Sequence, residues 1–183
     1  DVERSRGLGD VYKRQVVVKV TGASAHGSRP EEGVNPLPRL ALFLKESGLA
    51  LAPNGYAQAV RYLTDLYGTD YLGRTMGLAY SDDFMGPLTM SPNLIREKDG
   101  KVDVLVNVRM PRGNTPEALA KATTERIKAW GAQAGVAVEV DHNQGNWMAR
   151  DPQGAWLATL LNTFGDTTGL EAKPVPTCLL CTS

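Results

Sequence analysis

The pattern of hydrophobic and polar positions predicts helices in four stretches. Apolar residues recur every three to four positions over residues 36–48, 56–68, 116–135 and 151–164, and this spacing places them on one face of a helix. The first stretch follows the capping pair Asn35-Pro36, and the third follows Thr115-Pro116, a cap with proline in the first turn. The tyrosines in and beside the second stretch are expected to pack in the core rather than bind a cofactor.

Extended segments are predicted at residues 15–21, 88–97, 102–110 and 136–140. Each is rich in β-branched residues or alternates in polarity, and Asp99-Gly100 between the second and the third is a strong hairpin signal. Alternation places the valines of residues 102–108 on one face, which we expect to be buried. The opposite face, able to line a cleft, carries Asp103, Leu105, Asn107 and Arg109.

A strand, a helical segment, a hairpin, a helix and a strand in this order predict an α+β fold, a ferredoxin-like open sheet with helices on one face. We expect this domain to span residues 16–142. Residues 143–176 then form a linker and the first helix of another, α/β domain, of which only a truncated piece is expected here. The end segments 1–15 and 177–183 are expected not to be native.

Composition and charge restrict the function classes. The chain has 183 residues, is 42% hydrophobic, and carries 20 basic and 20 acidic side chains, as in a globular protein without a strong electrostatic field. Binding to nucleic acid or to a membrane is therefore not expected. Cys178 and Cys181 lie together near the end, which argues against a disulfide framework and favours a reducing, cytoplasmic location.

Most candidate sites have ordinary explanations. The pair Asp82-Asp83 could hold a metal ion, but a solvated loop pair or a helix cap explains it better. Cys178 and Cys181 have the spacing of zinc and redox motifs without a second pair, and His142 is expected to be a surface residue. No motif for a nucleophilic triad, a phosphate-binding loop or a zinc protease is present, so a self-contained metal site is not favoured.

His26 and Arg109 are harder to dismiss. His26 follows a predicted strand in a bed of small residues, which leaves an imidazole room to approach a ligand, although a lone histidine is by default structural or solvated. Arg109 stands next to Asn107 on one strand face, where its guanidinium could bind a carboxylate or simply be hydrated. From the residues alone both interpretations stay open.

Two motifs in this order resemble a known superfamily. GASAHGSRPEEGVNP before a helix and VDVLVNVRMPRGNTPE before another resemble the lid, or dimerisation, domain of the aminoacylase, succinyl-diaminopimelate desuccinylase and carboxypeptidase superfamily of two-metal peptidases. The segments between them are most similar to the PepV-like (Xaa-His, carnosinase-like) dipeptidases. The resemblance covers about residues 16–176.

The resemblance implies a role for each candidate. His26 matches the lid histidine that polarises the scissile carbonyl and stabilises the oxyanion. Arg109 matches the arginine that binds the C-terminal carboxylate of the substrate, and Asn107 is a supporting candidate. The implied parent is a dipeptidase that uses two divalent metal ions, zinc or manganese, with short peptides as substrates and a monomer favoured over a homodimer.

The motifs of the metal ligands do not occur in this sequence, so the resemblance implies that the chain binds no catalytic metal. It also implies that the chain depends on a catalytic domain of the same protein and is inactive alone. A non-catalytic ferredoxin-like module for binding or dimerisation is the alternative. A small-molecule-binding regulatory domain is less favoured still.

Overall fold

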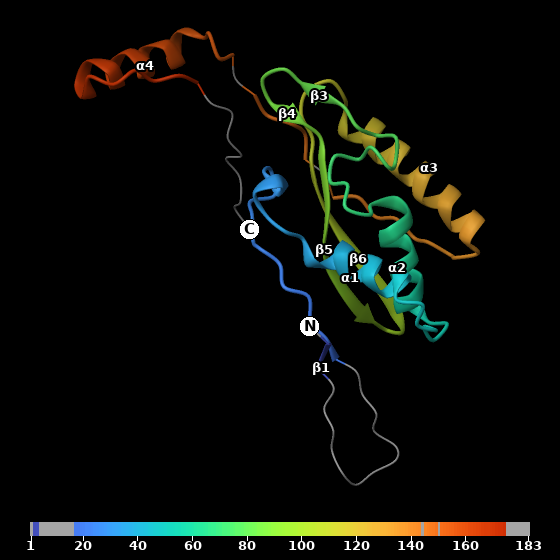
Figure 1. The fold of residues 1–183 in the computed structure, drawn as a ribbon. Helices are drawn as coiled ribbons and strands as arrows, with labels where there is room; N and C mark the ends of the chain where they lie inside the picture. Colours follow the sequence, from blue (N-terminus) through green and yellow to red (C-terminus); the bar gives the residue numbers. More distant parts are fainter. Residues whose placement is uncertain (1, 4–16, 144, 150, 175–183) are drawn as a thin grey trace.

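The computed structural model describes residues 2–3, 17–143, 145–149 and 151–174 (Figure 1). Apart from Val2–Glu3, the expected non-native ends, with Cys178 and Cys181, therefore lie outside the described residues. The elements in chain order are β1 (Val2–Glu3), β2 (Val17–Val18), the 3-10 turn η1 (Pro30–Glu32), α1 (Pro36–Glu46), α2 (Gly55–Leu66), β3 (Ser81–Asp82), β4 (Gly86–Pro87), β5 (Thr89–Lys98), β6 (Lys101–Arg109), α3 (Pro116–Ala134) and α4 (Ala155–Thr168).

The long hairpin β5–β6 is the centre of the fold. Its antiparallel register pairs Thr89 with Arg109 at one end and Lys98 with Lys101 at the other. The turn residues Asp99 and Gly100 both have positive φ, 52° and 75°, as a two-residue turn that matches strand twist requires. The hairpin predicted from the sequence is confirmed.

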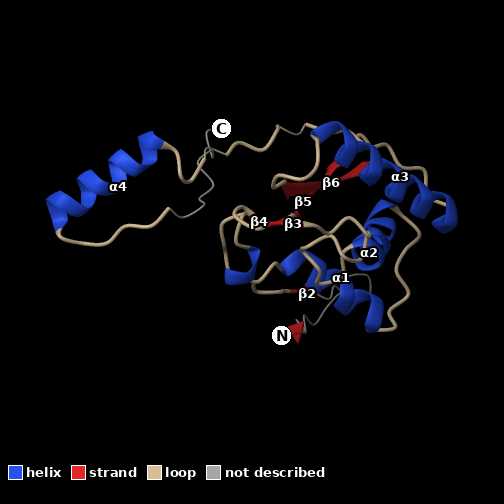
Figure 2. Ribbon diagram, turned by 90° about the horizontal axis from the view of Figure 1, so that it is seen from above, coloured by secondary structure: helices blue, strands red, loops and turns tan. Residues whose placement is uncertain are grey.

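Helices α2 and α3 lie on one side of this hairpin, and the loop that contains η1 lies on the other (Figures 1 and 2). The core forms on the helix side, where Leu63 of α2 and Leu119 of α3 are each 1% exposed. The β-strand valines on the buried face pack against this cluster. They are Val104, Val106 and Val108.

The helix boundaries follow the capping residues that the sequence predicts. The side chain of Asn35 accepts a hydrogen bond from the Leu37 N–H, and that of Thr115 accepts one from the Ala118 N–H. These bonds satisfy backbone donors that a helix leaves unpaired at its start. At the other end of α3, Gly135 adopts the left-handed conformation of a helix C-cap.

An aromatic cluster joins α2 to α3. The Tyr62 ring packs edge to face on Tyr67 and on Trp130, with centroids 5.6 and 5.4 Å apart, and the Tyr62 and Tyr67 hydroxyl oxygens lie 3.1 Å apart. Burial raises the pKa of both tyrosine hydroxyls above the usual value. These two tyrosines are therefore core residues, as expected, whereas Tyr56 is 48% exposed.

Two predicted strands differ from the structure. Of the predicted strand 15–21, residues 17–21 are described, and among them Val17–Val18 forms a strand paired with β1. Residues 136–140 form none. The alternation of residues 136–140 is nevertheless real, because the three valines are half-buried and the residues between them are exposed. The alternating pattern thus identified the buried side chains correctly. It could not show whether a neighbouring strand is present to pair with the backbone, which a strand also requires.

The last described helix begins later than predicted. The predicted stretch begins at Asp151, but the carboxylate of this residue accepts a hydrogen bond from the Gln153 N–H in a preceding turn, and Gly154 is the N-cap of α4. Both views show α4 set apart from the other helices (Figures 1 and 2). Within the described residues, no helix is both long and apolar enough to span a membrane. The α+β class is confirmed.

Candidate functional site

The loop that carries His26, residues 21–36, is closed by a backbone bridge near its two ends. Ala23 and Val34 exchange two backbone hydrogen bonds, of 3.0 and 2.9 Å. A Cβ atom on Gly33 would lie 2.6 Å from the Cβ of Ala25, and one on Gly22 would lie 2.6 Å from the Val34 carbonyl oxygen. The small residues around His26 therefore allow the two limbs of the loop to meet.

His26 begins a tight turn. The Arg29 N–H donates to the His26 carbonyl oxygen at 2.8 Å. Within this turn the Ser28 N–H donates to Nδ1 of His26 at 3.3 Å, and the Ser28 Oγ lies 2.8 Å from the same nitrogen. The imidazole is exposed at the surface, and Ser28 contacts it through Nδ1.

Three hydrogen bonds attach this loop to strand β5. The Thr89 hydroxyl donates to the Gly27 carbonyl oxygen at 3.1 Å. The Asn35 amide donates to the Ser91 hydroxyl at 3.0 Å and to the Pro92 carbonyl oxygen at 2.7 Å. The Asn35 side-chain oxygen meanwhile caps α1, so this one residue fixes both the loop and the helix.

Asn107 and Arg109 lie directly beneath the loop. Ser91 is the cross-strand partner of Asn107, and Thr89 is that of Arg109, so all four side chains share the face opposite the core. A Cβ atom on Gly27 would lie 3.0 Å from Oδ1 of Asn107 and 3.5 Å from Nε of Arg109. Glycine at this position lets the backbone next to His26 rest on both side chains.

Two atoms of this face are buried without a hydrogen-bond partner in the described part of the chain. They are an acceptor, Oδ1 of Asn107, and a donor, Nε of Arg109. A buried polar group left unpaired costs about 1–3 kcal/mol, and such groups require an explanation, a functional one among them. His26, Asn107 and Arg109 are thus brought to one region, with unused hydrogen-bonding capacity beneath the loop.

Asp82, the first residue of the acidic pair, is engaged elsewhere. The Arg112 guanidinium donates two hydrogen bonds to the Asp82 carboxylate, at 3.0 and 3.1 Å, and the Phe84 and Met85 N–H groups donate to it as well. The Arg112 hydrogen bonds, together with that from Met85, hold the pKa of Asp82 below its ordinary value. Asp82 therefore stabilises the β3–β4 turn, which accords with a loop rather than a metal site.

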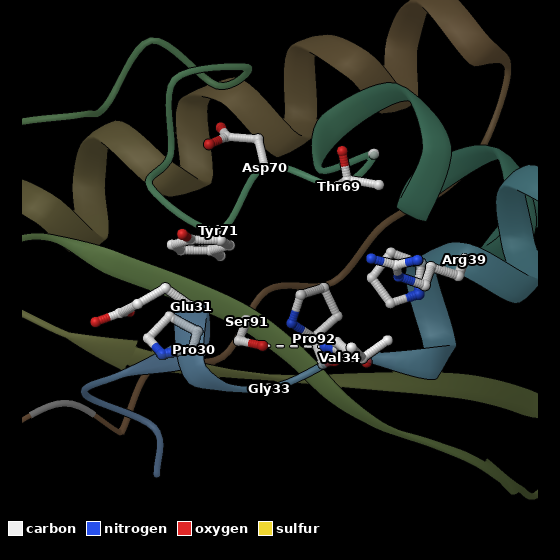
Figure 3. Close-up of a pocket in the computed structure, with 13 residues that line it drawn as sticks. Pro30, Glu31, Gly33, Val34, Arg39, Thr69, Asp70, Tyr71, Ser91 and Pro92 are labelled. Atoms are coloured by element: carbon white, nitrogen blue, oxygen red, sulfur yellow. Dashed lines mark hydrogen bonds between the residues drawn. The ribbon is translucent and has the colours of Figure 1, made fainter. Parts of the chain in front are cut away.

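A surface pocket of about 250 Å³ lies between residues 30–35 of the His26 loop and the segment around Tyr71 (Figure 3). Tyr71 forms one side of it and Pro30 and Pro92 the other, while Glu31 and Arg39 stand at opposite ends. Sequence reasoning did not find this pocket, because its walls come from segments far apart in the chain.

Sequence reasoning also missed Ser28 and Thr89 as partners of the site. Thr89 could have been found, because the Asp-Gly turn fixes the register that places it opposite Arg109. Elsewhere, His142 is exposed and its Nε2 lies 2.8 Å from the Thr124 hydroxyl, an ordinary surface contact. Among the residues that the structure describes, no group of three or more His, Cys, Asp or Glu side chains could hold a metal ion.

The comparison with protein families identifies the domain. Residues 13–133 match the family described as "Peptidase dimerisation domain". The chain belongs to this family. The matched range contains both motifs on which the resemblance was based and the three candidate site residues. Membership also agrees with the ferredoxin-like α+β arrangement expected from the element order.

Curated relatives of this peptidase dimerisation domain are dipeptidases by name. The chain is 32% identical over 122 residues, 66% of its length, to the "Beta-Ala-Xaa dipeptidase" of Lactobacillus delbrueckii subsp. lactis. It is 28% identical over 107 residues, 58% of its length, to the "Putative dipeptidase YtjP" of Bacillus subtilis. A third, named "Putative dipeptidase", from Staphylococcus saprophyticus, is 29% identical over 164 residues, 87% of this chain.

The matched segments are 25%, 22% and 32% of these relatives' own lengths. The chain thus spans about a third or less of the length of these relatives. The predicted resemblance to a dipeptidase family is confirmed at the level of the domain.

Proposed function

We propose that this chain is the lid domain of a metal-dependent dipeptidase that hydrolyses short peptides with a free C-terminal carboxylate. The observation that carries the proposal is that Asn107 and Arg109 share the hairpin face opposite the core and lie directly beneath Gly27, the residue that follows His26. Two buried polar atoms of these two side chains have no partner among the described residues, and the named relatives of the domain are dipeptidases.

In this proposal Arg109 binds the substrate and sets its register. A guanidinium presents several N–H donors in a plane and binds a carboxylate in a bidentate manner. Asn107, two residues earlier on the same strand face, is the supporting residue of this contact. An anchor at a fixed distance from the scissile bond selects short peptides and orients that bond.

His26 then acts on the carbonyl oxygen. Peptide hydrolysis places negative charge on this oxygen in the tetrahedral intermediate, and a donor aimed at it stabilises the transition state. The Ser28 N–H donates to Nδ1 of His26, which is therefore an acceptor. The neutral ring then carries its proton on Nε2 and donates from there. Because His26 is exposed on a loop, its ring can be presented to a carbonyl held by another domain.

The described residues do not fit the two metal ions that the resemblance implies. No group of three candidate ligand side chains exists among them, and the Asp82 carboxylate is occupied by Arg112. We therefore assign the activation of the attacking water to the catalytic domain of the parent. The proposal includes the expectation that this chain alone is inactive.

Replacement of His26 in the complete enzyme tests the proposal. His26→Ala should lower kcat by about 100-fold to 1000-fold, the usual effect of removing one oxyanion donor, with metal content unchanged. His142→Ala is the matched control, because it removes the other histidine of the chain at an exposed position, and its kcat should stay within twofold of wild type. Unaltered turnover in His26→Ala would leave the binding or dimerisation module as the better interpretation.

A further inference from the structure

We propose that Ser28 and Thr89 are positioning residues for His26. Thr89 fixes the loop above Arg109, and Ser28 fixes the ring so that Nε2 carries the proton. The inference rests on the proposed function of His26, but it concerns two residues that neither the family match nor the sequence motifs assign.

Thr89 connects the two proposed substrate contacts. It is 3% exposed, its backbone pairs with Arg109, and its hydroxyl donates to the Gly27 carbonyl oxygen, one residue from His26. A β-branched side chain has few rotamers, and a buried hydroxyl that lost its partner would be left unsatisfied. Thr89 therefore fixes the distance between the guanidinium on β6 and the imidazole on the loop.

Ser28 acts on the ring itself. An N–H group can only donate, so the 3.3 Å contact from the Ser28 N–H makes Nδ1 of His26 an acceptor. The Ser28 hydroxyl, 2.8 Å from the same nitrogen, donates to it in the same state. Both contacts favour the tautomer with the proton on Nε2, because a proton on Nδ1 would oppose the Ser28 N–H.

Such control is chemically useful because an oxyanion donor has two requirements. The proton must be on the nitrogen that faces the substrate, and the nitrogen must lie at hydrogen-bond distance from the developing charge. A displacement of about 1 Å can reduce the rate about 100-fold. Ser28 meets the first requirement and Thr89 the second, without either touching the substrate.

The tautomer is tested on the full 183-residue chain by the ¹⁵N chemical shifts of the imidazole nitrogens, at a pH where the ring is neutral. Wild type should show the proton mainly on Nε2. Ser28→Ala, which removes one of the two contacts to Nδ1, should increase the Nδ1–H population, whereas Thr89→Val should not. A wild-type ring protonated mainly on Nδ1 would overturn the assignment to Ser28.

The distance is tested in the complete enzyme by kinetics. Thr89→Val removes the hydroxyl and keeps the shape, and should lower kcat by on the order of tenfold with KM within twofold. Thr89→Ser keeps the hydroxyl and should recover most of the rate. A Thr89→Val enzyme with the circular dichroism spectrum and kcat of wild type would overturn the role of Thr89.

These outcomes are separate from a failure of the proposed function. If His26→Ala had no effect on kcat, the oxyanion role would be wrong, yet the NMR measurement would still decide whether Ser28 fixes the ring. If His26→Ala lowered kcat and Thr89→Val did not, the function would stand and the positioning role of Thr89 would fall.

Discussion

Glycine and alanine residues around His26 serve a purpose that the sequence did not reveal. The sequence suggested that small neighbours give the imidazole room to reach a ligand. In the structure Gly22 and Gly33 lie where the two ends of the loop contact each other, and Gly27 rests on Asn107 and Arg109. Contacts between loop residues 8 to 12 positions apart, such as Gly33 with Ala25 and Gly22 with Val34, leave no periodic signal. Sequence reasoning could therefore identify the composition but not its cause.

At the same scale, Asp82 predicts a pH dependence of stability. Its pKa is lowered in the folded state, so its contribution is present above the unfolded pKa of about 3.9 and is lost as the pH falls through the folded pKa. Asp82→Asn should therefore reduce the unfolding midpoint in urea at pH 6, and its difference from wild type should shrink below about pH 4. A difference that grew on acidification would contradict this account.

The neighbouring residue supplies the control for that measurement. Asp83 is exposed, and its carboxylate makes no hydrogen bond or ion pair within the described residues. Asp83→Asn removes the same charge from the same turn and should leave the midpoint nearly unchanged at every pH.

Elements were predicted well where local signals specify them. The Asp-Gly turn, the Asn35 and Thr115 caps and the glycine after α3 are all decided within a few residues of chain, and the structure confirms each. Residues 136–140 failed as a strand although their alternation was correct, because a strand also depends on the position of a distant partner. The start of α4 was displaced because Asp151 caps a separate turn.

The cap of α3 carries a prediction at this scale. Thr115→Ala removes the acceptor for the Ala118 N–H and should lower the free energy of unfolding by about 1 kcal/mol. Thr115→Ser keeps an acceptor hydroxyl and should cost much less. Chemical denaturation of both variants measures this, and equal stability of Thr115→Ala and wild type would show that the cap is not used.

For the molecule as a whole, the two faces of the hairpin have different roles, one in the core and one in the candidate site. One face of β5–β6 packs on α2 and α3 and forms the core, and the other carries Asn107 and Arg109 beneath the His26 loop. Strand alternation predicted that Asn107 and Arg109 share a face away from the core. That Gly27, next to His26, rests on these two side chains was not predicted, since no local rule brings residues 27 and 109 together.

The proposed function depends most on Arg109 as the carboxylate anchor. Arg96 provides a matched control, because it is exposed on the same hairpin face, opposite Asp103 near the turn. Replacement of either arginine removes one positive charge from this face. Only Arg109 has its Nε buried without a described partner.

The most direct measurement is kcat/KM of the complete enzyme on a dipeptide with a free C-terminal carboxylate and on its C-terminal amide. Arg109→Ala should lower kcat/KM for the carboxylate by about 100-fold, corresponding to loss of a charge-assisted contact of a few kcal/mol, and should hardly affect the amide. Arg96→Ala should preserve the wild-type preference. An equal loss on both substrates in Arg109→Ala would contradict the anchor and, with it, the proposed site.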